Sequence, residues 1–442
     1  MIESKTPDQK STRLKTPTSN GAIPGPENIT RQTLKNGITV LARPNFNSPS
    51  VTVNGYLQVG SLTDPDEKLG LSDFTAACLT RGTQKRDFQQ FHEALESVGA
   101  RLGIASGMHT TSFHGQALAE DLDLLLASLA EALIQPVFPN EQVERLRTRF
   151  LTGLAMRAQD TEEMAGLICS RLLYGNHPYS RPGDGYPETI QAITRQDLVD
   201  FHARAYGPRG MTVVVVGGID PHLAVERVSA VLGEWQNPGQ PLPGDLPELV
   251  ELSEPVRQDH NIPGKSQADL VAACIGPSRS SPDYLPAALG NNILGEFGMM
   301  GRIGEVVRNQ AGLAYSAQSS LSAGIGPGSW IIDAGVDPVN VEQALDLIQL
   351  EIKRFISEPV SQSELVDSQE NFIGSLPLSL ETNIGVASAL LLLEKYQLGF
   401  DYYQTYTERI RSVTVEQVLE TAQRYLDPAR MAIAVAGTLV KQ

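Results

Sequence analysis

The sequence predicts an α+β protein built from two related domains, and three observations support this. An internal repeat divides the chain into halves, clustered strands are separated by pairs of helices, and a segment rich in proline and glycine joins the halves. The chain has 442 residues, of which 41% are hydrophobic and 19% are charged, so each half can bury a core. We therefore expect an α+β fold rather than alternating parallel units.

The repeat is clearest near the end of each half. The segment IQAITRQDLVDFHARAYGPRGMTVVVVGG starts at Ile190, and IRSVTVEQVLETAQRYLDPARMAIAVAGT starts at Ile410. Thr194 and Thr414 occupy matching positions, 220 residues apart. In each copy a threonine caps a helix, a proline ends the connection, and a run of Val, Ala and Ile enters a buried strand. A weaker repeat ends a leucine-rich helix before a proline in both halves.

The repeat and the composition together set the expected domain boundaries. We expect a disordered polar tail over residues 1–28, an N-terminal domain over 29–234, a linker over 235–260 and a C-terminal domain over 261–442. The linker begins WQNPGQPLPGDLPELVELSEP, in which proline, glycine and acidic residues dominate. The two halves should then be homologous domains of similar size.

Within the first half, hydrophobic spacing predicts strands and helices in turn. The segments TVLAR and SVTVNGYLQVGS have the alternation of strands, followed by a helix with Asp87 as its cap and Gly99 as its stop. The strand segment ARLGIASGMHTTSFHGQALA follows, and a second leucine-rich helix comes after it. The periodic apolar positions are Val51, Val53, Leu57 and Val59, then Phe88, Phe91, Leu95 and Val98, then Leu122, Leu125, Leu129 and Leu133.

Charge and composition exclude several classes of function. The net charge of −16 argues against nucleic acid as a partner, because phosphate binding needs clustered Lys and Arg. Three separated cysteines, Cys78, Cys169 and Cys274, indicate neither a disulfide framework nor a thiolate zinc site. The N-terminus lacks the apolar core of a secretory signal, and no run of about 18 apolar residues predicts a membrane span. We therefore expect a cytoplasmic protein.

The segment GLSDFTAACLTRGTQK, from Gly70, carries the main resemblance. Gly70, Phe74, Gly82 and Thr83 fit the frame G-x-x-H-F-x-E-H-x-x-x-x-G-T. The chain thereby resembles the insulinase/pitrilysin family of zinc peptidases, the processing-peptidase-like inverzincins, from about residue 33 to 439. The resemblance implies two homologous domains, each a mainly antiparallel sheet covered by helices, around an interior cavity.

The same resemblance implies that the zinc site is degenerate. The positions of the first histidine, the catalytic glutamate and the second histidine are Asp73, Ala76 and Ala77, and the third ligand position falls at Gly153. Alanine and glycine side chains have no donor atom, and Asp73 alone cannot hold zinc. Glu162 and Glu163 lie too far along the chain to substitute. We expect no metal and no catalytic residue on this chain.

None of the seven histidines offers a replacement site. His109 and His114 are five residues apart on an expected strand, so they should face opposite sides of it. His92 lies on an expected helix without a second His or Cys. His177 lies in a segment, YGNHPYSRPGDG, that resembles a structural loop of the family.

The second half keeps a different family feature. The segment NILGEFGMMGRIGEVVRNQAGLAYSAQSS, from Asn292, resembles the family's Gly-rich turn, helix and V-R-x-x-x-G-L-A-Y signature. The resemblance implies that Arg308 and Tyr315 bind the backbone of a peptide substrate. Gly295, Gly298 and Gly301 are expected to form a loop before the helix.

Three functions fit these residues. The chain is expected to be the non-catalytic subunit of a two-chain peptidase, supplying Arg308 and Tyr315 while a partner subunit with H-x-x-E-H holds zinc in a heterodimer. It could instead be a structural scaffold with no role in proteolysis, like the respiratory core proteins of this family. A peptidase with rearranged metal ligands is the third hypothesis, which metal analysis of the purified chain would decide.

Overall fold

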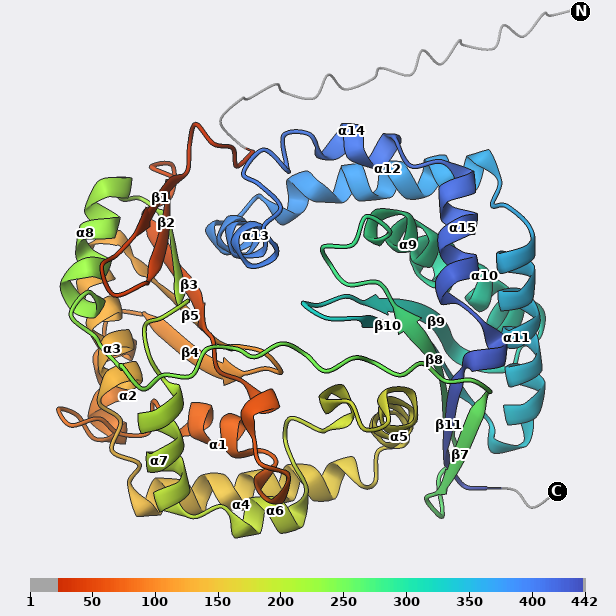
Figure 1. The fold of residues 1–442 in the computed structure, drawn as a ribbon, viewed down its shortest axis with the longest axis horizontal. Helices are drawn as coiled ribbons and strands as arrows, with labels where there is room; N and C mark the ends of the chain where they lie inside the picture. The colour runs from red at the N-terminus through yellow and green to blue at the C-terminus, as the bar shows by residue number, and fades with distance from the viewer. Residues whose placement is uncertain (1–22, 440–442) are drawn as a thin grey trace, which may run out of the picture.

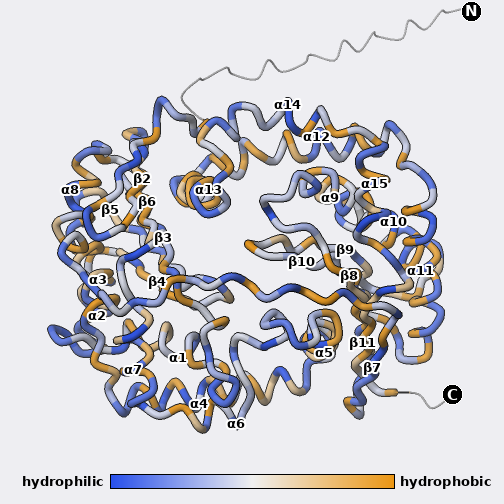
Figure 2. Tube along the Cα trace, in the orientation of Figure 1, coloured by the Kyte–Doolittle hydropathy of each residue, from blue (hydrophilic) through white to orange (hydrophobic). Residues whose placement is uncertain are grey.

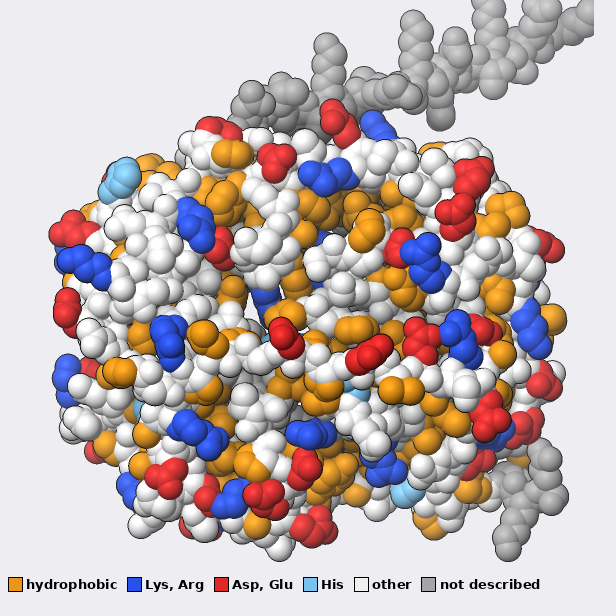
Figure 3. All heavy atoms as spheres, viewed as in Figure 1, with side chains coloured by type: hydrophobic (Ala, Val, Ile, Leu, Met, Phe, Trp, Pro, Cys, Tyr) orange, Lys and Arg blue, Asp and Glu red, His pale blue; other side chains and the backbone are white. Residues whose placement is uncertain are grey.

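The computed structural model describes residues 23–439, so most of the expected tail, residues 1–28, lies outside the described residues. Within 23–439 the strands form two sheets, one in each half of the molecule (Figure 1). The predicted α+β fold of two domains, each with a mainly antiparallel sheet, is confirmed. The domains face each other across a region that is hollowed on the visible face (Figure 3).

The N-terminal sheet has the strand order β1-β2-β6-β3-β5-β4. The β2–β6 pair is parallel, and all other neighbouring strand pairs of this sheet are antiparallel. Its strands are β1 (Thr30–Thr33), β2 (Thr39–Pro44), β3 (Ser50–Leu57), β4 (Arg101–Ser106), β5 (Thr111–Leu118) and β6 (Thr212–Gly217).

The C-terminal sheet repeats this plan without an equivalent of β1. Its order is β7-β11-β8-β10-β9, and again one pair, β7–β11, is parallel. Its strands are β7 (Val256–Asn261), β8 (Ala268–Gly276), β9 (Ala314–Ser322), β10 (Gly328–Val336) and β11 (Ala432–Gly437). The predicted repeat therefore extends from sequence to topology, because β6 and β11 occupy matching places 220 residues apart.

The repeated glycines explain how these two strands end. Gly217 and Gly437 close β6 and β11 with φ of 153° and 156°. A Cβ at Gly217 would lie 2.3 Å from the carbonyl oxygen of Ser50, and one at Gly437 would lie 2.7 Å from the Cα of Ala268. A side chain at either position would push neighbouring strands apart, so the sheets require glycine there.

Helices cover both sheets. In the N-terminal half they are α1 (Leu71–Cys78), α2 (Phe88–Glu96), α3 (Leu122–Ile134), α4 (Asn140–Arg157), α5 (Thr161–Tyr174), α6 (Pro187–Ala192), α7 (Arg195–Ala205) and α8 (Pro221–Leu232). In the C-terminal half they are α9 (Tyr284–Asn291), α10 (Phe297–Gly304), α11 (Val341–Ser357), α12 (Gln362–Ser379), α13 (Asn383–Tyr396), α14 (Tyr406–Arg411) and α15 (Val415–Tyr425). Each half has its own apolar core between sheet and helices.

The two halves also exchange a helix. Helix α5 of the N-terminal half packs on the C-terminal sheet, with Ile168 and Cys169 against the alanines of β11. Helix α13 of the C-terminal half packs on the N-terminal sheet, with Leu390 against Val214 and Leu41 (Figure 1). Figure 2 shows apolar residues along α13 and α5. The strands β6 and β11 are therefore buried on both faces, and the exchanged helices join the domains.

Among the described residues, no single helix meets the length and hydropathy expected of a membrane span. Helices α12 and α13 meet them only as a pair, and that pair is bent by 117°.

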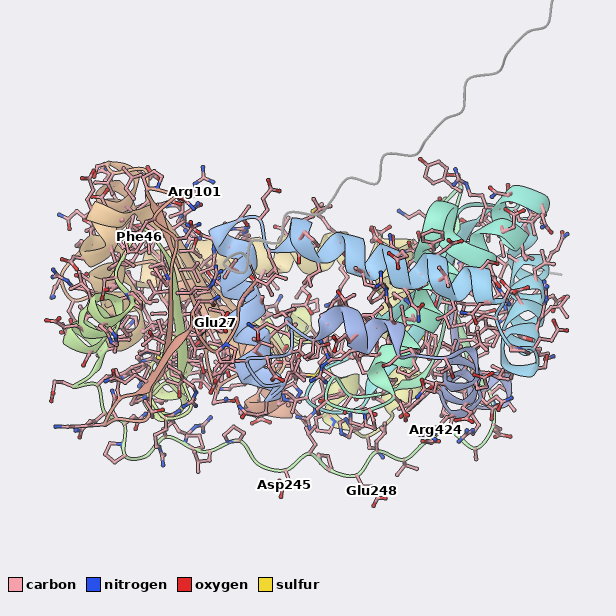
Figure 4. All side chains as sticks on the ribbon, turned by 90° about the horizontal axis from the view of Figure 1, so that it is seen from above. Glu27, Phe46, Arg101, Asp245, Glu248 and Arg424 are labelled. Carbon is pink, nitrogen blue, oxygen red and sulfur yellow. The ribbon has the colours of Figure 1, made fainter. Side chains whose placement is uncertain are left out.

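The segment between the halves runs along one face of the molecule. Residues 233–255 contain no helix or strand, and Asp245 and Glu248 mark their course in Figure 4. Strand β7 begins at Val256, so the last residues of the expected linker, 235–260, are instead an edge strand. The sequence VRQDHN is polar and half-exposed, which is why composition alone did not reveal a strand.

The capping threonines offer a test of the repeat. Thr194 and Thr414 each accept a hydrogen bond from the backbone N–H three residues later, within a capping box. Thr194→Ala and Thr414→Ala should each lower the free energy of unfolding by about 1 kcal/mol. Urea unfolding would measure this, with Thr152→Ala, exposed within α4, as the control expected to change little. Equal losses for the control and the caps would contradict the assignment.

Candidate functional site

Helix α1 is positioned by a buried carboxylate. Asp64 accepts hydrogen bonds from the backbone N–H groups of Gly70 and Ser72, both at 3.0 Å, and so anchors the first turn. Burial raises the pKa of Asp64 to about 7 despite these bonds. The helix is thereby fixed against β4 and α4, which brings the predicted ligand positions toward one place.

The structure brings two of the predicted zinc positions to one pocket. Ala77 on α1 and Gly153 on α4 both line a cavity of about 440 Å³. Ala76 is buried and does not line it. The full lining is Ala77, Thr80, Arg81, Leu102, Gly103, Ile104, Leu146, Arg149, Phe150, Gly153, Leu154 and Asp184.

Asp73, at the first ligand position, stands close to this pocket. Burial, together with the charge of Asp184 in the pocket wall, raises the pKa of Asp73 to about 6. No side chain lining the cavity carries an imidazole or thiolate, and its one carboxylate, Asp184, is bound to Arg157. Within residues 23–439, no group of three or more His, Cys, Asp or Glu side chains could hold a metal ion. The residues at the expected zinc-ligand positions therefore do not provide the side chains that a zinc ion needs.

The other candidates lie elsewhere. Glu162 and Glu163 are in the first turn of α5 and line a separate cavity with Asp333. His177 accepts a hydrogen bond through Nδ1 from the backbone of Tyr179, and His109 bonds the Tyr179 hydroxyl at 2.7 Å.

None of the histidines lines the pocket. His109 is in the turn before β5 rather than on a strand as expected, while His114 is on β5. His92 packs against the rings of Phe88 and Phe91 on α2.

The raised pKa of Asp73 leads to a stability prediction. Its value in the unfolded chain is near 3.8 and in the folded chain about 6, so folding is favoured by the protonated form. The contribution of Asp73 to the free energy of unfolding is fully present below its unfolded-state pKa of 3.8. It is lost as the pH rises through its folded-state pKa of about 6. Asp73→Asn should therefore raise the free energy of unfolding at pH 8 by about 1–2 kcal/mol, and by little at pH 4.

Urea unfolding at both pH values would measure this effect. Asp346→Asn, at an exposed position on α11, is the matched control and should change stability little at either pH. An Asp73→Asn variant less stable than the parent at pH 8 would contradict the argument.

Arg308 and Tyr315 lie together on the C-terminal half. The Arg308 Cζ is 5.9 Å from the centre of the Tyr315 ring, a cation–π contact. Tyr315 opens β9, the edge strand of the sheet, and 83% of it is exposed. Arg308 is half-buried, and its guanidinium makes no hydrogen bond or ion pair with any residue of the described chain. Both polar groups are therefore free to bind a ligand.

The segment before and including Arg308, residues 292–310, contains two π-helical stretches. Asn292–Glu296 and Glu305–Gln310 are π-helical and flank α10, so the expected loop at Gly295, Gly298 and Gly301 is instead helical. A Cβ at Gly295 would lie 2.0 Å from the backbone nitrogen of Ser319, so glycine lets this segment pass directly over β9. Glycine composition predicted a loop because it does not distinguish a turn from close backbone packing.

Sequence reasoning missed the charged lining of the pocket. Arg81 follows α1, and Arg149 lies one turn before Gly153 on α4. The helical spacing of Leu146, Arg149 and Gly153 could have placed them on one face with the third ligand position. Asp184 had no local signal, because it comes from a loop distant in sequence.

Comparison with known proteins gives two adjoining family matches. Residues 39–181 match the model described as insulinase (peptidase family M16), and residues 192–372 match the peptidase M16 inactive domain. An uncharacterized zinc protease of Mycobacterium leprae is 26% identical over 423 residues, covering 92% of both chains. The β subunit of the mitochondrial-processing peptidase of Saccharomyces cerevisiae is 25% identical, covering 85% of this chain and 83% of that one.

Solved structures share the fold. A peptidase M16 inactive domain from Pseudomonas fluorescens superposes with a TM-score of 0.87 at 26% identity, covering 94% of this chain and 99% of that one. A protease from Helicobacter pylori gives the same TM-score at 18% identity, covering 94% and 100%. The periplasmic protease PqqL of Escherichia coli gives 0.79 at 17% identity, and there the match covers 94% of this chain and 46% of that one.

Proposed function

Because the chain belongs to the insulinase family, peptidase family M16, and lacks donor atoms at three of its four zinc-site positions, we propose that it is the non-catalytic subunit of a two-chain zinc peptidase. In this proposal a partner subunit with H-x-x-E-H holds zinc, which would polarise the scissile carbonyl and activate water. This chain would hold the peptide substrate through Arg308 and Tyr315.

The observation that carries the proposal is the contrast between the two sites. Ala77 and Gly153 leave the pocket of the N-terminal half without metal ligands, whereas Arg308 and Tyr315 remain adjacent and accessible on the C-terminal half. The scaffold alternative gives Arg308 and Tyr315 no role, whereas the two-chain proposal uses both side chains. The guanidinium supplies donors for a peptide carbonyl or carboxylate, and the phenol supplies one more.

The size of the chain also supports pairing. The PqqL match, which shows the fold alone, covers almost all of this chain but only 46% of that protein. A heterodimer of two such chains would have the same number of domains as the longer protein. The family resemblance therefore favours a partner of similar length rather than a small accessory protein.

Purification from native cells tests the proposal. We expect a chain with H-x-x-E-H to copurify, and the mixture to cleave peptides much faster than either chain alone. Cell fractionation before purification would test the predicted cytoplasmic location at the same time. A partner whose peptidase activity is unaffected by this chain would favour the scaffold alternative.

Metal analysis tests the remaining alternative, a peptidase with rearranged metal ligands. Stoichiometric zinc on the isolated chain, with peptide hydrolysis that a chelator abolishes and zinc restores, would replace the proposal with a peptidase using rearranged ligands.

A further inference from the structure

The pocket at the abandoned zinc position contains unneutralised positive charge. Arg81 and Arg149 both line it, Arg81 from the end of α1 and Arg149 from α4. Neither side chain forms an ion pair or hydrogen bond with any residue in the described range 23–439, and the nearby Arg145 of α4 adds a third such charge. This local excess contrasts with a net charge of −16 for the chain.

Arg81 is held in place but incompletely satisfied. Its Cζ lies 4.9 Å from the centre of the Phe88 ring, which fixes the guanidinium plane. Its Nε is buried and has no hydrogen-bond partner. Burial and then the charge of Arg149 lower the pKa of Arg81, so the folded chain bears an unfavourable interaction here. A bound anion would relieve it.

The carboxylate already in the pocket does not neutralise these arginines. Asp184 contacts the Arg157 Nη1 at 2.5 Å, and Arg157 also donates to the backbone oxygen of Gly185 at 2.9 Å. Asp73 interacts electrostatically with Asp184. The pocket lining thus combines a carboxylate that is already paired, Asp184, with two arginines, Arg81 and Arg149, that have no acidic partner among the described residues.

The apolar residues of the pocket lining favour a ligand whose carboxylate is attached to an apolar group. Five large apolar side chains line the cavity, and its volume of about 440 Å³ is within the range of small-molecule and short-peptide sites. These side chains are Leu102, Ile104, Leu146, Phe150 and Leu154. Arginine pairs bind carboxylates bidentately, while the apolar walls favour an uncharged side chain.

Part of the pocket lining comes from an edge strand. Leu102 and Ile104 belong to β4, an edge strand of the N-terminal sheet, and the first residue of that strand is Arg101. In Figure 4, Arg101 lies on the side of the molecule away from Asp245 and Glu248.

We propose that this pocket binds a carboxylate attached to an apolar group, and specifically the C-terminal residue of a peptide, through Arg81 and Arg149. The site that relatives use for zinc would then serve in this chain as a binding site for a peptide end. This proposal goes beyond the two-chain peptidase, because it concerns the isolated chain and needs no partner.

Calorimetric titration of the isolated chain tests the site. The probes are N-acetyl-Phe-Leu with a free carboxylate, the same dipeptide as its C-terminal amide, and octanoate. We expect the acid to bind and the amide to bind at least about tenfold more weakly, because the charge-assisted hydrogen bonds are lost. Acid and amide of equal affinity, or no binding of the acid up to about 10 mM, would overturn the proposal.

Variants assign the binding to the two arginines. Arg149→Gln, at an exposed position, and Arg81→Met should each weaken binding of the acid by about tenfold or more. Arg171→Gln is the control, an exposed arginine on α5 that does not line the pocket, and should change affinity less than about twofold. If Arg81→Met fails to fold, Arg149→Gln alone decides. Tight binding of octanoate without binding of the dipeptide would overturn the assignment to a peptide end.

Discussion

Arg308→Ala in the assembled two-chain peptidase should lower kcat/KM by roughly 10- to 100-fold. The guanidinium has no partner among the described residues and lies 5.9 Å from the Tyr315 ring, so its donors are available to substrate. Losing a charge-assisted hydrogen bond to a peptide costs about 1.5–3 kcal/mol, which sets the size of the effect. Initial rates on a peptide substrate would measure it.

The matched control is Arg409→Ala. Arg409 also stacks on a tyrosine, with its Cζ 5.3 Å from the Tyr402 ring, but it lies on α14, away from β9. Its replacement should leave kcat/KM within about twofold, since it removes a similar surface contact without a substrate role. Size-exclusion chromatography would check that both variants stay assembled. Equal losses for Arg308→Ala and Arg409→Ala, or intact activity in the former, would remove the substrate role of Arg308.

Tyr315→Phe separates the two members of this pair. The hydroxyl is the part of Tyr315 that can donate to a substrate carbonyl, whereas the ring alone maintains the contact with Arg308. A decrease in kcat/KM without loss of assembly would therefore assign a role to the hydroxyl. The combined Arg308→Ala and Tyr315→Phe variant is expected to lose activity while remaining in the complex.

Most of the fold could be predicted because its signals are local or repeated. Thr194 and Thr414 cap α7 and α15 in the same manner, and the buried strands that follow them take the same place in each sheet. The offset of 220 residues between the two repeats indicates two copies of one domain. That Ala76, Ala77 and Gly153 offer no side-chain ligand follows from the sequence alone, because the side chains of alanine and glycine have no donor atom in any fold.

The features that sequence did not reveal depend on contacts between distant segments. The pocket combines Arg81 from the end of α1, Arg149 from α4 and Asp184 from a loop, and no spacing rule links these three. Strand β7 was missed because VRQDHN is stabilised by its parallel pairing with β11 rather than by apolar periodicity. The π-helical stretch at Gly295 was missed because it depends on the close approach of Ser319, which is a contact between segments distant in sequence.

Leu390→Ala should be among the most destabilising single substitutions in the chain. The leucines of this stretch suggested only a short apolar run in the sequence, but α13 places Leu390 at full burial against the sheet of the other half. Truncating a buried leucine removes its transfer energy and leaves a cavity, with a typical cost of about 3 kcal/mol. Because α13 joins the halves, the loss should also loosen the junction between domains.

Two measurements separate these effects. Urea unfolding gives the free energy, and limited proteolysis within residues 233–255 reports separation of the halves, because that segment crosses between them without helix or strand. Leu350→Ala on α11 is the control, since 63% of Leu350 is exposed and its loss should cost little. Ile168→Ala on α5, the reciprocal helix, should behave like Leu390→Ala. If Leu390→Ala and Ile168→Ala lower stability without faster cleavage of residues 233–255, the exchanged helices stabilise each sheet separately and do not couple the domains.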